Sequence, residues 1–381
     1  QDKPGFKMYQ HFGKKLNTNL GKIENAGGYV LQSGKSSESD NQLTRIDGMK
    51  MYNDLVAANI DPEDAYMQVL SHFESEITLP SQNNPTKAYI TLQGQDKVAV
   101  VNVNTGTLIN HVDVDFINVN DAPYYIVIDA TNAYWYCTLI STGLVLKFDL
   151  NTDELVDSVY VGSMPALMAI DETHQFLYVS RFMPMGGMST ESQEIHQINT
   201  QTMDVIGIVN VGADSPHGIA LSSDGEILWV ASNQASHFFK IETDRFGDTS
   251  YQPQNFRIGT DVPSSYEIND GFYNALELEL NYDDSQLFIS CSNTMEVRVF
   301  DTTTGDSLYT ISTGMMPWHL QISKEGNISE IFVSNRMSNT VTIYNPVTGE
   351  LHSLADDSMD MLHGCALSAD DYLLVVTSCF W

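Results

Sequence analysis

Basic residues are scarce in this chain of 381 residues: 18 Lys and Arg stand against 49 Asp and Glu, which gives a formal net charge of −31 and a pI near 4.3. Proteins that bind nucleic acid need basic side chains to neutralise phosphates, so this balance argues against nucleic acid as a partner. Long apolar runs are lacking too. No segment has the roughly 18 to 20 consecutive apolar residues that a membrane-spanning helix requires.

Cysteine is also sparse, and the common catalytic motifs are missing. The chain has four cysteines, widely spaced, with no CxxC pair, haem-attachment motif or zinc-ribbon spacing. It has no GxSxG elbow, no GxxxxGK[ST] loop, no HExxH and no GxGxxG between a strand and a helix. These absences weaken an enzymatic interpretation without excluding it, because some folds assemble a site from single residues on separate strands.

The charge is unevenly distributed along the chain. Residues 1–50 contain eight basic and five acidic residues, so a mildly basic arm precedes a body of net charge −34. Such an acidic body suits a salty or extracytoplasmic medium, and a cation-collecting surface is the alternative. The sequence opens with Gln1 and shows no basic and apolar leader, so we expect a processed or trimmed chain, which favours export.

Internal repetition indicates the architecture. An apolar strand that ends in Ser or Asp recurs, as in Met168-Ala-Ile-Asp171 and Leu320-Gln-Ile-Ser323. A turn and a second apolar strand follow, as in Leu177-Tyr-Val-Ser180, Leu228-Trp-Val-Ala231 and Ile331-Phe-Val-Ser334. A strand of alternating pattern and a fourth strand complete each unit of about 45 residues, which is the pattern of a β-propeller blade.

The repeats resemble those of the YVTN (YncE-like) β-propeller family. The resemblance rests on Pro216-His-Gly-Ile-Ala-Leu-Ser-Ser-Asp-Gly225 with Leu228-Trp-Val-Ala-Ser-Asn233, and on Ile331-Phe-Val-Ser-Asn335 with Asn339-Thr-Val-Thr-Ile-Tyr344. It covers residues 76–381 and is specific for the fold rather than for a function. It implies similarity to surface-layer proteins, binding modules, and the propellers of nitrous oxide reductase and haem d1 nitrite reductase.

Counting the units predicts an all-β, seven-bladed β-propeller. Complete units begin near residues 76, 123, 165, 216, 273 and 317, and a seventh unit from Leu362 supplies only two strands. An open sheet edge is a liability, so we expect an N-terminal strand near Gly28-Tyr-Val-Leu-Gln-Ser33 to complete the last blade. The alternative is a chain trimmed at its C-terminus.

Residues 1–75 do not follow the repeat and are expected to form a small, partly helical N-terminal extension. Asp61-Pro62-Glu63 has the features of a helix start, and a preceding helix is expected from about Arg45 to Ala58. We expect the extension either to pack on one face of the propeller domain, residues 76–381, or to dock a partner protein.

Histidines and methionines near the blade entrances define the candidate site. Aligned on the innermost strands, His217 and His363 occupy equivalent positions, and His319 lies one residue later, where a regular strand would turn it to the other side. The loop Met183-Pro-Met185-Gly-Gly-Met188 belongs to the same face. Thioethers and imidazoles are ligands suited to Cu(I), so the predicted metal site is His217, His319, His363, Met183, Met185 and Met188. The alternative is that these methionines fill gaps or form an adaptable contact surface.

The sequence therefore predicts a non-catalytic, extracytoplasmic propeller that acts as a scaffold subunit and binds a protein or ligand, for example within a cell-envelope complex. No cofactor other than copper is expected, and neither nucleic acid nor a membrane-spanning segment is part of this interpretation. A copper-binding metalloprotein, or a propeller enzyme with a site at the channel entrance, is the alternative.

Overall fold

The computed structural model describes the chain in eleven segments: residues 6–12, 15–19, 30–33, 87–103, 106–116, 120–182, 193–260, 271–323, 330–357, 359–368 and 373–378. For 6–12, 15–19, 30–33 and residue 373 only the backbone is described. The helical elements described in full in these segments are two short 3₁₀ turns, Gln93–Gln95 and Thr243–Arg245. None of the described helices is long and apolar enough to cross a membrane.

Six four-stranded antiparallel sheets follow one another along the chain, and we call them blades 1 to 6. Blade 1 holds β3 (Val30–Ser33), β4 (Lys87–Leu92), β5 (Lys97–Asn102) and β6 (Thr107–Asp113). Blade 2 holds β7 (Pro123–Asp129), β8 (Tyr134–Leu139), β9 (Leu144–Asp149) and β10 (Leu155–Tyr160). Blade 3 holds β11 (Pro165–Asp171), β12 (Phe176–Arg181), β13 (Glu194–Asn199) and β14 (Asp204–Asn210).

The remaining strands follow the same scheme. Blade 4 holds β15 (Pro216–Leu221), β16 (Ile227–Ser232), β17 (His237–Glu242) and β18 (Gln254–Arg257). Blade 5 holds β19 (Ala275–Leu280), β20 (Gln286–Cys291), β21 (Glu296–Asp301) and β22 (Ser307–Ser312). Blade 6 holds β23 (Pro317–Ile322), β24 (Ile331–Asn335), β25 (Thr340–Asn345) and β26 (Glu350–Ala355). A terminal sheet joins β27 (Leu362–Leu367) and β28 (Leu373–Ser378) to β1 (Phe6–Phe12) and β2 (Lys15–Asn19).

The predicted fold class needs correction, although its all-β propeller architecture is confirmed. The structure describes six blades in chain order, not seven, and almost no helix in the described residues. The strand expected near Gly28–Ser33 to complete the last blade is wrong too, because β3 pairs with β4 of blade 1, whereas β1 and β2 lie beside β28. The two helices expected between residues 45 and 75 fall outside the described residues.

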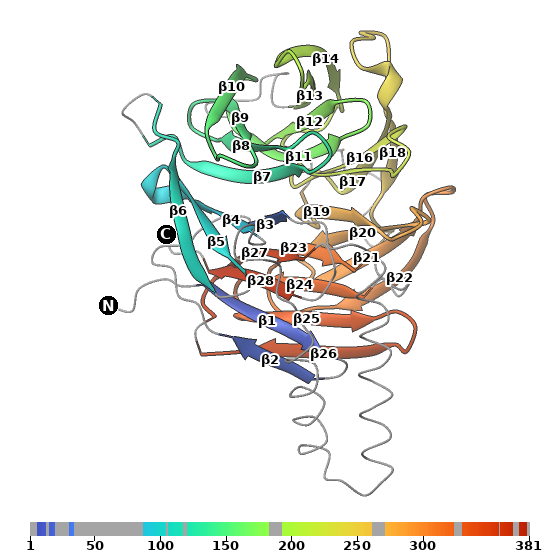
Figure 1. The fold of residues 1–381 in the computed structure, drawn as a ribbon. Coiled ribbons are helices and arrows are strands. Elements are labelled where there is room, and N and C mark those ends of the chain that lie inside the picture. The colour runs from blue at the N-terminus through green and yellow to red at the C-terminus, as the bar shows by residue number, and fades with distance from the viewer. Residues whose placement is uncertain are drawn as a thin grey trace, which may run out of the picture.

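The first strand of each blade is the innermost one. Strands β3, β7, β11, β15, β19 and β23 pack side by side in that order, and β27 of the terminal sheet packs against both β23 and β3. Figure 1 shows the sheets arranged around this common axis. Short antiparallel strands of a blade need only tight turns between them, which is why Gly or Asn and Asp recur at the predicted turns.

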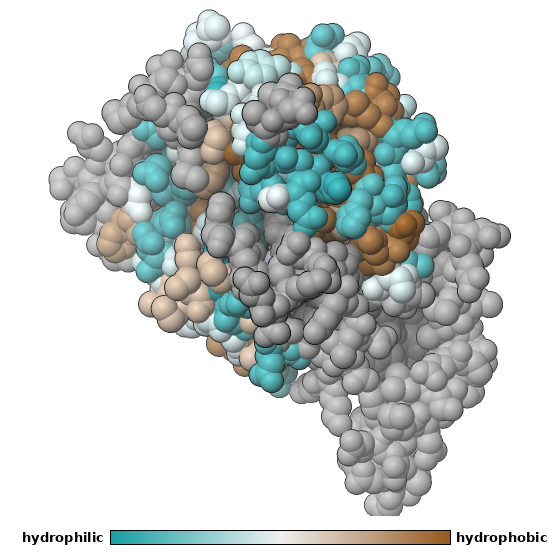
Figure 2. All heavy atoms as spheres, turned by 90° about the vertical axis from the view of Figure 1, so that its left-hand side faces the viewer, coloured by the Kyte–Doolittle hydropathy of each residue, from teal (hydrophilic) through white to brown (hydrophobic). Residues whose placement is uncertain are grey.

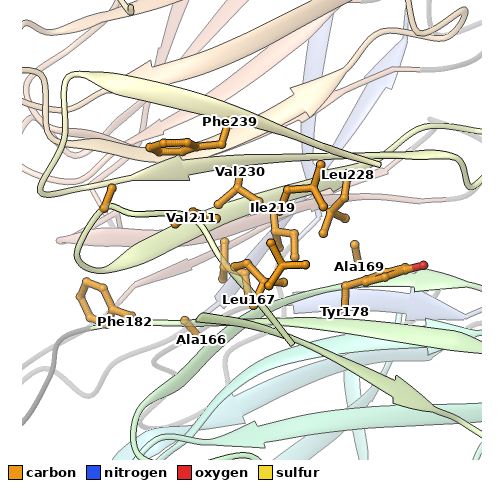
Figure 3. Close-up of a cluster of buried hydrophobic side chains, with 14 of the residues drawn as sticks. Ala166, Leu167, Ala169, Tyr178, Phe182, Val211, Ile219, Leu228, Val230 and Phe239 are labelled. Carbon is orange, nitrogen blue, oxygen red and sulfur yellow. The ribbon is translucent and has the colours of Figure 1, made fainter. Parts of the chain in front are cut away.

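Apolar layers between adjacent blades form the core. Between blades 3 and 4, for example, Leu167 and Tyr178 face Ile219, Val230 and Phe239 (Figure 3). The alternating pattern of the strands produces these layers, because each sheet turns one set of side chains toward each neighbour. The outermost strands instead carry exposed positions, and the coloured surface drawn in Figure 2 is largely hydrophilic with smaller apolar areas between.

Removal of residues 1–19 is expected to destabilise the terminal sheet. Strand β1 pairs antiparallel with β28, from Phe6 opposite Thr377 to Gln10 opposite Leu373, so the deletion turns β28 into an edge strand. We expect the melting temperature to fall by about 10 °C, since each kcal/mol is worth roughly 2–4 °C in a protein of this size. Hydrogen exchange should lose protection at Leu374 to Val376 but not in β16. An unchanged melting temperature with full protection of β28 would contradict this expectation.

Candidate functional site

A β-bulge recurs on the innermost strands, and it shapes the axis of the propeller. The register of β7, β11, β15, β19, β23 and β27 shifts after the first residue of each strand. In β23, Pro317 lies opposite Asn335 and Leu320 lies opposite Val333, so two residues share the single partner Ser334. A bulge interrupts the strict alternation of side chains. Consecutive residues, the second and third of each strand, can therefore both face the axis.

The second residues form an aromatic layer across the axis. The Tyr124 hydroxyl lies 2.9 Å from Nε2 of His217, and the Tyr124 ring is 6.0 Å from both the His217 and His363 rings. His363 in turn lies 5.1 Å from the Trp318 ring, over which the Arg336 guanidinium is placed. Tyr124, His217 and His363 are buried. This layer thus fills the axis with side chains from blades 2, 4 and 6 and the terminal sheet.

The third residues form a second layer with acid–base character. Glu277 of β19 and His319 of β23 are both buried, and Oε2 of Glu277 lies 3.1 Å from Nδ1 of His319. The ring of Tyr125, from β7, lies 6.3 Å from the His319 ring. The layer therefore places a carboxyl group, an imidazole and a phenol close together at the axis.

Burial governs the protonation of this second layer. Desolvation, followed by the nearby Glu279 charge, raises the pKa of Glu277 well above its usual range. Desolvation and the neighbouring His217 lower the pKa of His319 to about 3. Burial, then the charge of Glu277, also raises the pKa of Tyr125. Burial therefore favours the neutral form of each of the three groups, and a positive charge brought to Glu277 would favour its ionised form.

A buried hydroxyl on the second strand links each bulge to the next blade. Ser334, for example, accepts a hydrogen bond from the His319 N–H at 3.1 Å and donates to the His363 carbonyl at 3.1 Å. We call this pattern the hydroxyl bridge. Five such side-chain hydroxyls each donate a hydrogen bond to a backbone carbonyl of the following sheet. The donor and acceptor pairs are Thr91 with Tyr124, Thr138 with Ala166, Ser180 with His217, Ser290 with Trp318, and Ser334 with His363.

Blade 4 lacks this hydroxyl and uses a histidine instead. Ala231 occupies the place of the serine on β16. Nδ1 of His217 is hydrogen-bonded to the Leu276 carbonyl of the following blade, and Nε2 of His217 is hydrogen-bonded to the Tyr124 hydroxyl. The neutral ring that donates through Nδ1 and accepts through Nε2 fits both contacts. Burial lowers the pKa of His217 to about 4, which keeps the ring neutral at pH 7.

The structure brings the three predicted histidines together at the axis, in two adjacent layers. His319 does not turn to the other side, because the bulge makes its strand irregular. Met183, Met185 and Met188 lie outside the described residues. Within the described segments, no cluster of three or more His, Cys, Asp or Glu side chains is arranged to hold a metal ion.

Methionine enrichment at the blade entrances has a backbone explanation. The residue before each innermost strand from β7 on has positive φ, and three of these six residues are Met164, Met316 and Met361. The left-handed backbone conformation costs a non-glycine residue about 1–2 kcal/mol, so the surrounding blade must hold the chain in it. Met168 and Met359 are buried in the core, whereas Met315 is exposed. The described methionines therefore do not converge on one point.

Sequence reasoning overlooked Glu277, Glu279 and Tyr125. A signal for the two glutamates was present, because Leu276-Glu-Leu-Glu279 is the one innermost strand with two acids among leucines. The recurring Ser or Thr at the end of the second strand was visible too. Its bridging role required the spatial position of the next blade.

Comparison with known proteins supports the fold and leaves the function open. No family model matches the sequence, and no curated protein matches it. The streptogramin B lyase structure aligns over 76% of this chain and 89% of that chain, with 12% identity and a TM-score of 0.59. Kuenenia stuttgartiensis hydrazine synthase aligns over 68% of this chain and 80% of that chain, with 16% identity and a TM-score of 0.55. These similarities identify a β-propeller repeat protein.

Replacing Ser334 with Ala should destabilise the protein measurably. The change removes the bridge between β24, β23 and β27 and leaves a buried N–H and a buried carbonyl without this hydroxyl. A loss of about 1–3 kcal/mol in the free energy of unfolding is expected, measured by urea denaturation. Ser353→Ala on the exposed strand β26 is the matched control and should change stability by less than about 0.5 kcal/mol. Equal effects of the two changes would contradict a bridging role.

The stability of the protein should fall with decreasing pH in part through His217. Its folded pKa is lowered to about 4 from 6.5, so the unfolded chain binds the additional proton between these values. Its contribution to the free energy of unfolding is therefore intact above pH 6.5 and is lost as the pH falls toward 4. His217→Gln, which keeps one donor and one acceptor, should reduce the slope near pH 5 by about 1 kcal/mol per pH unit. An identical slope in both proteins, from urea denaturation at several pH values, would show that His217 is not neutral when folded.

Proposed function

We propose that the chain is a non-catalytic, extracytoplasmic β-propeller of the YVTN (YncE-like) type that binds another protein as a scaffold subunit. The observation that carries the proposal is a row of exposed apolar side chains on the face where the chain enters the innermost strands. Phe272, Met295, Met315 and Met337 are 43, 48, 54 and 54% exposed, respectively. We call these four residues the Met–Phe row.

The four residues belong to loops that are bonded to one another across blades 5 and 6. The Asn293 side chain donates to the Phe272 carbonyl at 3.2 Å, which joins the first two loops. The Met295 carbonyl accepts from Thr313, and the Met315 carbonyl accepts from Met337. The row therefore lies on a hydrogen-bonded base. Flexible thioethers on a fixed base are suited to adaptable apolar contacts with a partner.

The axis supports a binding role more than a catalytic one. Both ring nitrogens of His217 are engaged, and the side chains of the aromatic layer are packed on one another. The two similar structures carry the names of a lyase and a synthase, so a propeller enzyme is the alternative class. At 12 and 16% identity those names carry no activity over to this chain. The extracytoplasmic location is supported by the net charge of −31.

Replacing Met315 or Met337 with Asp should abolish partner binding. Each change places a charge at the centre of the Met–Phe row, and we expect affinity to fall by about tenfold or more. The measurement is quantitative mass spectrometry of chains that co-purify with tagged wild-type and variant proteins from the native host, followed by titration of the partner found. Tyr282→Asp, 41% exposed on the turn between β19 and β20, is the matched control. A partner retained equally by all the variants would remove the Met–Phe row from the proposal.

Cu(I) binding is the second candidate, favoured by the convergence of three imidazoles from β15, β23 and β27. The Tyr124 hydroxyl occupies Nε2 of His217, so a metal must displace it. Tyr124→Phe should therefore raise the Cu(I) affinity, and His363→Ala should lower it. Competition titration with a Cu(I) chelator under reducing conditions measures both. A wild-type protein that takes up no copper would rule out this candidate.

A further inference from the structure

Beside the His217 layer, the innermost strands of blades 5 and 6 form an acidic site at the axis. Glu277 and Glu279 are two residues apart on β19, so they project from the same side of the strand. The Gln321 side chain of β23 donates to Oε1 of Glu279 at 3.2 Å, and His319 lies against Glu277. With Tyr125 from β7, these side chains make up what we call the axial acid site.

Glu277 is the unusual member of the site. It is 3% exposed, and its Oε2 atom accepts no hydrogen bond from any described residue. The contact with Nδ1 of His319 is close, at 3.1 Å, but the two atoms are not aligned as a hydrogen bond. Burying a carboxyl oxygen without a hydrogen-bond donor destabilises the folded protein, because the oxygen loses its hydrogen bonds to water and no protein group replaces them. A ligand that supplies an N–H group at this point would recover that energy.

Solvent reaches the axis beside Glu277. Glu279, Gln321 and Tyr125 are each partly exposed, although all lie on innermost strands. The net charge of −31 raises the concentration of cations around the protein. Access, acidity and one unmatched acceptor, Oε2 of Glu277, thus occur at one place.

We propose that the axial acid site binds a small organic ammonium ion, with its N–H groups donated to Glu277 and Glu279 and its alkyl group against the Tyr125 ring. An ammonium group supplies three donors and a positive charge, which matches two carboxylates and an aromatic face. A directly ligated metal fits less well, because no group of three or more metal-ligating side chains is found in the described part of the chain. This site is separate from the Met–Phe row and goes beyond the scaffold role.

The test is calorimetric titration of the full chain with methylammonium chloride at constant ionic strength, balanced with sodium chloride. Wild-type protein should show saturable binding at a single site. Glu277→Gln and Glu279→Gln should each weaken it by about tenfold or more. Glu279→Gln is the safer variant, since Glu279 is partly exposed, and circular dichroism establishes that each variant is folded.

Glu226→Gln on the exposed turn of blade 4 is the matched control and should bind methylammonium like the wild type. Two results would overturn the proposal: no saturable binding by wild-type protein, or unchanged affinity in the folded Glu277→Gln and Glu279→Gln variants. Magnesium chloride in place of methylammonium separates the ligand classes, because tighter, glutamate-dependent magnesium binding would assign the site to a divalent cation instead. Loss of partner binding in the Met315 and Met337 variants leaves this titration unaffected.

Discussion

The structure depends on the contact between the bulge of one innermost strand and the hydroxyl of the strand beside it. Ser180 shows the geometry: it accepts from the Leu167 N–H in its own blade and donates to the His217 carbonyl of the next. The bridge thus joins one side chain to backbone groups of two neighbouring sheets, next to the axis. The hydroxyl bridge therefore fixes the spacing of the innermost strands, which the apolar layers alone would leave adjustable.

Blade 4 shows what happens when the hydroxyl is lost. With Ala231 in that place, His217 reaches the Leu276 carbonyl directly, and β15 approaches β19 closely. A Cβ on Gly218 would lie 2.8 Å from Cα of Glu277, so only glycine fits at this approach. The buried histidine and Gly218 thus belong to the same close approach of β15 to β19.

The sequence allowed the repeat and the strand order to be predicted, because these follow from periodicity. Three features could not be predicted. Residues 28–33 were expected to complete the last blade, but β3 pairs with β4 in blade 1 and β1 lies opposite β28. Pairing between segments so far apart in the sequence leaves no local pattern, and the blade count was wrong. The bulge reverses the expected direction of His319. The role of Glu277 depends on burial and on its neighbours across the axis, which composition does not report.

The hydroxyl bridge also explains why the side chains that line the axis can differ so much from one blade to the next. The bridge uses the backbone N–H of the third residue and the backbone carbonyl of the second, so it does not constrain the side chains at either place. Those side chains range from Ala166 to Trp318 at the second residue and from Gly364 to His319 at the third. His217 is the exception, because its own ring replaces the bridge. His217 therefore has a structural role through its side chain, while the backbone N–H of Glu277 makes a bond to Ser290 that any residue could make. A buried acid at a position that the fold does not dictate is better explained by a ligand than by stability.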